Sequence, residues 1–136
     1  MRPLTTTEIS DLLAAGDWYS SVVVVKAEQL RADRAWETRR GGRLVGRAGD
    51  WLVSEDGDHW TVTAEVFAQT YKPTDVHGHY RKTARVRAVR MARRFLVETL
   101  EGPVPGEAND WLVQNPGGDA WPIDAKTFER RYTVAP

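Results

Sequence analysis

Apolar side chains near the amino terminus recur at the spacing of an α-helix. They are Ile9, Leu12 and Leu13. Thr5 can cap this helix, and Glu8 stands at the capping-box position three residues later. The pattern predicts a helix over residues 5–16, which Gly16 ends in a left-handed conformation.

Short strand patterns fill most of the remaining chain. The valines at 22–25 predict a strand that is buried on both faces. Residues 83–89 alternate small apolar residues with arginine, which predicts a peripheral strand with one face in water. A glycine-rich turn is expected at residues 41–49, and Thr63 and Asp124 can each cap a short helix that follows the strands.

Much of this pattern is present twice. Residues 25–71 align with residues 86–132 at a separation of 60 to 61 residues, and seventeen aligned pairs are identical. The shared residues are mostly aromatic, glycine or β-branched, and they include the Asp-Trp-Leu-Val segments at 50–53 and 110–113. A position kept in both copies is needed by the repeated unit.

The duplication predicts an α+β fold. We expect two tandem strand-rich ββββα-like repeats, packed with pseudo-twofold symmetry, and an N-terminal capping helix. Each half alone would be marginally stable, so we expect a single compact domain. Its expected parts are the helix at 5–16, repeat one at 20–73, a link at 74–80 and repeat two at 81–134, within residues 1–136.

Composition excludes several kinds of chemistry. The chain has 136 residues and no cysteine, which excludes disulfides, thiol nucleophiles and cysteine-ligated zinc. No apolar run approaches the roughly 20 residues that span a bilayer, and the amino terminus lacks a secretory pattern. We therefore predict a soluble cytoplasmic protein with no membrane partner.

The charges balance overall but not locally. Nineteen basic and nineteen acidic residues cancel, so the total charge predicts no long-range attraction of nucleic acid. Residues 81–94, however, carry seven basic residues and no acidic one. These bases can pair with acids on neighbouring strands, or they can form a patch for an anionic partner. The candidate anion-binding residues are Arg85, Arg87, Arg90, Arg93 and Arg94.

The aligned segments resemble a known family. Gly49 to Val53, a glycine turn, Trp60, Phe67 and Tyr71 resemble the small bacterial PGDYG-type domain, usually met in uncharacterised proteins. The second copy is closer to this pattern, although it has Asn109 where a glycine is expected. Both copies have tryptophan where the family has tyrosine. The resemblance covers roughly 100 of the 136 residues, and it implies a compact domain without an established reaction.

The repeated Asp-Trp pairs are candidate ligand contacts, because carboxylates accept hydrogen bonds and indoles offer flat stacking surfaces. The ligand-binding candidates are Asp50, Trp51, Trp60, Asp110, Trp111 and Trp121. The alternative is structural: such aspartates commonly bind turn amides, and regularly spaced tryptophans are usually core residues. Both interpretations stay open at this point.

Other candidate sites are weaker. Asp75, His77 and His79 have a metal-like spacing but would need ligands from elsewhere in the chain, and a solvated link is the alternative. Glu37 and Glu98 are shared and could act as paired carboxylates, or they could be strand residues that pair with arginine. We predict no cofactor and assign no catalytic residue.

The pattern favours a non-enzymatic binding or accessory module of unknown ligand, acting through a surface or groove formed by the two repeats. The seventeen shared pairs include no histidine, cysteine, lysine or serine. A nucleic-acid or anionic-ligand binder that uses residues 81–94 is one alternative. A small enzyme with a site at the junction of the repeats is another, and a protein partner or homodimer also stays open.

Overall fold

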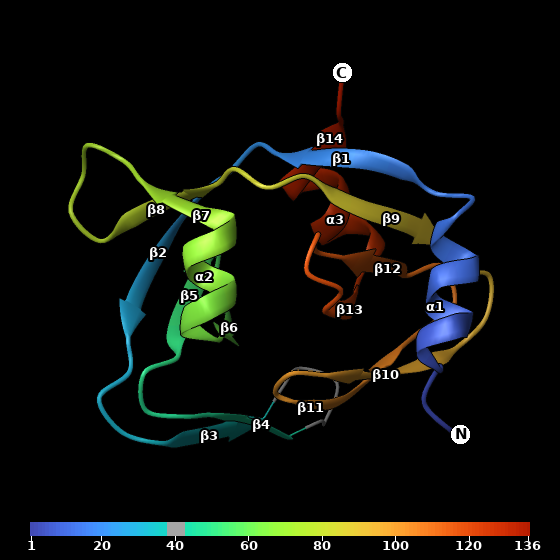
Figure 1. The fold of residues 1–136 in the computed structure, drawn as a ribbon, viewed down its shortest axis with the longest axis horizontal. Coiled ribbons are helices and arrows are strands. Elements are labelled where there is room, and N and C mark those ends of the chain that lie inside the picture. Colours follow the sequence, from blue (N-terminus) through green and yellow to red (C-terminus); the bar gives the residue numbers. More distant parts are fainter. Residues whose placement is uncertain (38–42) are drawn as a thin grey trace. The chain divides into compact units, whose positions relative to one another are not determined.

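The computed structural model describes residues 1–37 and 43–136 (Figure 1). The fold is α+β and mostly β, with three helices and two five-stranded antiparallel sheets in the described residues, which confirms the predicted fold class. Of the glycine-rich turn predicted at residues 41–49, residues 41–42 lie outside them, residues 43–46 form a strand instead, and a turn is present at residues 48–49. No described helix has the length and apolar character needed to cross a membrane.

The chain divides into two compact units, which are not the two halves of the sequence. Unit 1 contains residues 1–22, 85–99 and 103–136, whereas unit 2 contains residues 23–84 and 100–102. Each unit holds one five-stranded sheet. The expectation of a single compact domain stays a prediction.

The sheet of unit 1 has the strand order β13-β12-β9-β1-β14, and its neighbours pair antiparallel. Its strands are β1 (Asp17–Ser21), β9 (Val86–Arg90), β12 (Trp111–Gln114), β13 (Ala120–Ile123) and β14 (Tyr132–Val134). Unit 1 also contains two helices, α1 (Thr6–Leu13) and α3 (Ala125–Arg131), and the paired strands β10 (Phe95–Thr99) and β11 (Gly102–Gly106), of which only Gly102 belongs to unit 2.

Both faces of this sheet are covered. Leu112 and Val113 are neighbours in β12, so they point to opposite faces, and both are fully buried. Val113 packs with Phe128 of α3, and Leu112 packs with Leu13 of α1 and with Phe95 of β10.

The sheet of unit 2 has the strand order β6-β5-β2-β8-β7. Its strands are β2 (Val24–Gln29), β5 (Trp51–Glu55), β6 (Asp58–Val62), β7 (Tyr71–Pro73) and β8 (His79–Lys82). Helix α2 (Ala64–Thr70) packs on one face through Phe67, against Val25 and Val53 (Figure 1). Strands β3 (Arg34–Glu37) and β4 (Arg43–Gly46) form a separate pair.

Strands β1 and β8 take similar places in the two sheets. β1 lies between β9 and β14, although it precedes the first aligned segment in the chain. β8 lies between β2 and β7, although it precedes the second aligned segment. The chain leaves them through similar hydrogen bonds: Val22 N–H to the Arg131 carbonyl and Thr83 N–H to the Thr70 carbonyl, both 2.8 Å.

The predicted helix caps are confirmed. Thr5 and Glu8 form the capping box of α1, and Thr63 and Asp124 accept hydrogen bonds from the first turns of α2 and α3. The left-handed conformation predicted for Gly16 is wrong, because its φ is not positive. Glycine is needed there for close approach: a Cβ would lie 2.4 Å from the Ala88 carbonyl oxygen.

Two strand predictions are also wrong. The valine run is not buried on both faces, since Val25 is 4 % exposed while Val24 is 40 % and Val22 51 % exposed. The arginine-rich strand is not peripheral, because β9 is the middle strand of its sheet. The face that the arginines were expected to open to water is covered at Val89, which packs against the core under α1 and β10, but it stays open at the exposed Arg85.

Candidate functional site

An aromatic cluster packs beneath α2 in unit 2. Trp51 stacks on Phe67 with ring centroids 4.1 Å apart, and Phe67 contacts Tyr71 at 4.8 Å. Tyr80 from β8 meets Trp51 edge-on at 5.5 Å and Phe67 at 4.9 Å. These distances lie in the range where aromatic pairs attract beyond their burial.

Aligned residues make corresponding contacts in unit 1. Trp111 stacks on Phe128 at 4.2 Å, and Phe128 on Tyr132 at 5.1 Å. Tyr19 from β1 meets Trp111 edge-on at 5.6 Å and Phe128 at 5.0 Å. Burial, with a smaller effect of the Asp17 charge, raises the pKa of the Tyr19 hydroxyl.

Sequence reasoning missed Tyr19 and Tyr80 as members of these clusters. They stand 61 residues apart in the sequence, which is the separation of the aligned segments, but they lie before the segments begin. Extending the alignment towards the amino terminus would have found them.

The two repeated aspartates bind turn amides. Oδ2 of Asp50 accepts a hydrogen bond from Arg47 N–H at 2.9 Å, and Oδ2 of Asp110 accepts one from Glu107 N–H at 2.7 Å. Asp110 is buried, while Asp50 is half-buried. This geometry agrees with the structural interpretation of the pair, and ligand contact by these carboxylates stays a prediction.

The other candidate tryptophans are half-buried at the edges of the two cores. Trp60 from β6 packs against the core of unit 2, and Trp121 from β13 packs against the α3 side of unit 1. Their ring faces are therefore partly used in packing.

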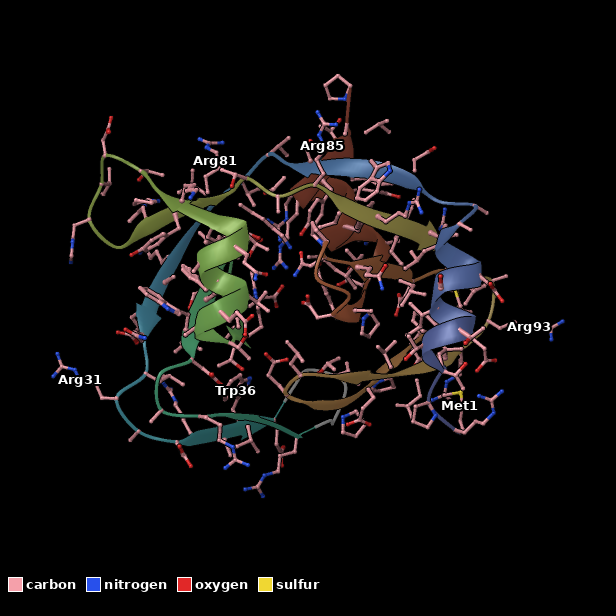
Figure 2. The ribbon with its side chains drawn as sticks, in the orientation of Figure 1. Met1, Arg31, Trp36, Arg81, Arg85 and Arg93 are labelled. Atoms are coloured by element: carbon pink, nitrogen blue, oxygen red, sulfur yellow. The ribbon has the colours of Figure 1, made fainter. Side chains whose placement is uncertain are left out.

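Unit 2 contains a pocket of about 610 Å³ at the end of β2. Its lining comes from the end of β2, the start of β5 and the β7–β8 connection. The lining residues are Ala27, Glu28, Gln29, Leu30, Arg31, Trp51, His77, Gly78 and Tyr80. Trp51 and His77 are the sequence-predicted candidates that the pocket brings together. Arg31, at the rim, extends away from the turn that follows β2 (Figure 2).

The connection on one side of the pocket is held by its own hydrogen bonds. Thr74 N–H donates to the His79 carbonyl at 2.9 Å, and His79 N–H donates to the Val76 carbonyl at 3.0 Å. Gly78 has a φ of 79°, and its carbonyl accepts the Ala27 N–H at 3.0 Å. This glycine therefore turns the chain and fixes the connection to β2.

The structure separates the predicted metal string. His77 lines the pocket, whereas His79 stands opposite Lys26 in the β2–β8 ladder. Asp75 is exposed and is not among the lining residues. Within residues 1–37 and 43–136, no group of three or more histidines or acidic residues is arranged to hold a metal ion.

The arginine side chains of residues 81–94 point to different faces and do not form one cluster. Arg87 lies over the Trp18 ring at 4.8 Å, while Arg90, three residues later in β9, is on the opposite face and donates to the Asn109 carbonyl at 3.3 Å. Arg94 pairs with Glu107 at 3.0 Å.

Arg85 and Arg93 flank β9 and are exposed (Figure 2). The predicted pairing of segment bases with acids is thus present at Arg94. Anion or nucleic-acid binding by the segment stays a prediction.

Comparisons with protein-family models, curated proteins and solved structures find no match for this chain. The resemblance to the PGDYG-type domain therefore stays a prediction.

Proposed function

We propose that the protein is a non-enzymatic binding module whose ligand occupies the pocket of unit 2. The observation that carries this proposal is the place of the pocket. It lies beside Trp51 and Tyr80, an aromatic pair whose counterpart in unit 1 is Trp111 and Tyr19, and it is lined by His77 and Gly78. At the separation of 61 residues these two positions correspond to Gly16 and Asp17, where the sequence differs. The pocket thus combines an aromatic pair present in both units with two residues, His77 and Gly78, that are present only in unit 2, and this combination suits a binding site.

The size and chemistry of the pocket support ligand binding. Its volume of about 610 Å³ falls within the range of roughly 300–1,000 Å³ that small-molecule sites occupy. Trp51 and Tyr80 offer apolar surface, and Arg31 and His77 offer groups that orient a polar ligand. The described lining has no serine, cysteine or lysine.

We also infer that the aligned segments are two copies of one PGDYG-like unit. The equal number and similar order of strands in the two sheets support this inference. So do the stacked pairs Trp51–Phe67 and Trp111–Phe128, whose centroid distances are 4.1 and 4.2 Å.

A thermal-shift screen of nucleotides, amino acids, aromatic carboxylic acids and short peptides tests the proposed function. His77→Ala and Arg31→Ala should weaken a hit at least tenfold, because each removes a polar group of the lining. Val76→Ala and Arg81→Ala are matched controls, since both residues are exposed in unit 2 and neither lines the pocket. Hits that all four variants bind equally well would contradict the proposal.

A further inference from the structure

We propose that the ligand of this pocket is a short extended peptide, which adds as a strand along the free end of β2 and places an apolar side chain against Trp51 and Tyr80. This inference rests on the proposed function and specifies its ligand. It follows from the backbone that lines the pocket.

The two neighbours of β2 cover different lengths of it. β5 pairs with Lys26 to Gln29, whereas β8 pairs with Val24 to Lys26. One more hydrogen bond, from Ala27 N–H to the Gly78 carbonyl, follows on the β8 side before the chain turns away at Gly78. The last part of β2 is therefore a sheet edge on that side.

Alternation along the strand shows which backbone groups this edge presents. Ala27 N–H points towards β8, so the N–H and carbonyl of Gln29, two residues later, point the same way. Leu30 N–H points to the other side, where the Asp50 carbonyl accepts it at 2.7 Å. In the part of the chain that the structure describes, the Gln29 N–H and carbonyl have no backbone partner.

An exposed strand edge is a template for another extended chain, because each open residue offers one donor and one acceptor at the spacing of a ladder. Gln29 itself lines the pocket, so a peptide that occupies the pocket can form both hydrogen bonds with it. An extended peptide can also continue the ladder beyond Gln29, which a compact metabolite cannot do. The edge therefore favours a peptide over a compact metabolite.

The side chain of Gln29 leaves this edge accessible. Its Nε2 donates to the Gly49 carbonyl at 3.0 Å, which ties the side chain to the turn before β5. At Gly78 no atom lies within 4 Å of the position that a Cβ would take. The absence of a side chain there leaves room beside the edge.

Cross-strand neighbours share a face, so the peptide residue opposite Gln29 would direct its side chain to the face that Gln29 shares with Trp51. Tyr80 meets Trp51 edge-on at 5.5 Å on that face. An aromatic or branched aliphatic peptide side chain would complete this pair, and the remaining peptide residues would be recognised mainly through their backbone.

The corresponding edge of unit 1 is arranged differently. There the chain reaches β1 from α1, and Gly16 packs so closely that a Cβ would meet the Ala88 carbonyl oxygen at 2.4 Å. Ala88 aligns with Ala27. We assign the peptide site to unit 2, where the pocket lies.

The experiment uses the full chain and a library of N-acetylated, C-amidated hexapeptides with phenylalanine or leucine fixed at one position. Libraries with lysine or aspartate fixed at that position are the comparison. Amide hydrogen exchange by NMR is the readout. The free Gln29 amide should exchange fast and become at least tenfold more protected with a bound peptide, with shifts at Ala27 and Gly78.

A pair of variants isolates the backbone donor. Gln29→Pro removes the backbone N–H, and an edge strand tolerates proline where this N–H has no partner in the sheet. Gln29→Ala removes only the side-chain hydrogen bond to the Gly49 carbonyl. Peptide affinity should fall at least tenfold in Gln29→Pro relative to Gln29→Ala. If Gln29→Pro does not fold, a depsipeptide whose ester replaces the amide donating to the Gln29 carbonyl should bind the wild-type chain at least tenfold more weakly.

The outcomes separate the two proposals. Peptides that bind without protecting the Gln29 amide overturn the strand-addition inference, as does equal affinity for the two Gln29 variants. Small-molecule hits that require His77, in the absence of any peptide binding, overturn the peptide inference and leave the binding module standing. Absence of every hit that depends on the pocket would overturn both.

Discussion

At the scale of single residues, the identities between the aligned segments reflect turn chemistry and close packing. Gly46 and Gly106 are a shared pair, and neither has a positive φ. A Cβ at Gly106 would lie 2.3 Å from the Phe95 ring, and one at Gly46 would lie 2.8 Å from the Thr61 side chain. Glycine is kept at these positions because a neighbouring side chain occupies the space of a Cβ.

Replacing Gly106 and Gly46 by alanine tests the explanation by close packing. Gly106→Ala should lower the free energy of unfolding by about 1–3 kcal/mol, because the buried Phe95 ring must move to admit a methyl group. Gly46→Ala should cost less, since it would meet only side-chain methyl groups of Thr61 and Leu30. Urea unfolding followed by tryptophan fluorescence measures both. If the stability of Gly106→Ala were unchanged, the Phe95 ring would move without cost and the explanation by close packing would be contradicted.

The shared aspartates give a second comparison. Asp110→Ala should destabilise the protein by about 1.5–3 kcal/mol, because a buried carboxylate that accepts the Glu107 N–H is lost. Asp50→Ala should cost less, since Asp50 is half-buried and water can replace its bond to Arg47 N–H. Urea unfolding of both variants provides the measurement. A larger loss of stability in Asp50→Ala than in Asp110→Ala would contradict burial as the cause of the difference.

Local signals predicted the residue-scale features well. Capping residues and repeated aromatics act through neighbours in the chain or through one helix face, so Thr5, Thr63 and Phe67 could be placed from the sequence. The pocket could not be placed, because Trp51, Tyr80 and Arg31 meet only after three strands have paired. Sequence indicated Trp51 and His77 separately and gave no reason to join them.

At the scale of elements, the exposure of a strand side chain depends on which helix or strand packs against its face of the sheet. The valine run at residues 22–25, which overlaps the start of β2, predicted two buried faces, but only Val25, on the face that α2 covers, is buried. The arginine alternation at 83–89 predicted an open face, which is open at Arg85 but covered at Val89 by the core under α1 and β10. Periodicity reports the character of a strand, whereas its place in the sheet depends on distant partners.

Helix α1 carries a titratable cap. Nη1 and Nη2 of Arg2 lie 2.6 and 3.0 Å from the Glu8 carboxylate, and Thr5 N–H donates to it at 2.9 Å. The hydrogen bond from Arg2, followed by that from Thr5, lowers the pKa of Glu8 from 4.5 to about 2. The folded state thus favours the ionised carboxylate.

The sign of the pH dependence follows from that lowered pKa. A carboxylate with a depressed pKa stabilises the fold above its ordinary value and loses this contribution as pH falls through the folded value. Glu8→Gln should therefore lower the melting temperature at pH 7 and have a smaller effect near pH 2. Calorimetry of the variant and the wild type at both pH values measures the difference. Arg2→Ala should raise the pKa of Glu8, which NMR titration detects, and an unmoved titration would contradict the assigned cause.

At the scale of the whole molecule, the two units and the two aligned segments have different boundaries. Residues 1–22 precede the first segment, yet they belong to unit 1 with residues 85–99 and 103–136. Alignment of a sequence with itself reveals similar local patterns, but it does not reveal which sheet a strand joins. β1 pairs with β9 and β14, which lie far from it in the chain, and no local sequence pattern predicts this pairing.

This topology predicts unequal effects of removing residues 1–22. Their removal takes away β1, which separates β9 from β14, and Leu13, which is 1 % exposed in the core under α1. All five strands of the unit 2 sheet remain, since they lie within residues 24–82. We expect the indole NMR signals of Trp111 and Trp121 to lose their dispersion, while those of Trp51 and Trp60 keep theirs.

Adding a synthetic peptide of residues 1–22 to the shortened chain provides the control. If the loss is due to the missing strand and helix, the peptide should restore the dispersed Trp111 signal in a saturable manner, because it supplies the partner of β9 and β14. A peptide with Leu13→Asp should fail, since it would place a charge in the core that Leu13 fills. Collapse of the Trp51 signal together with that of Trp111 would contradict separate stability of the two units. An intact Trp111 signal without the peptide would contradict the need for β1 in unit 1.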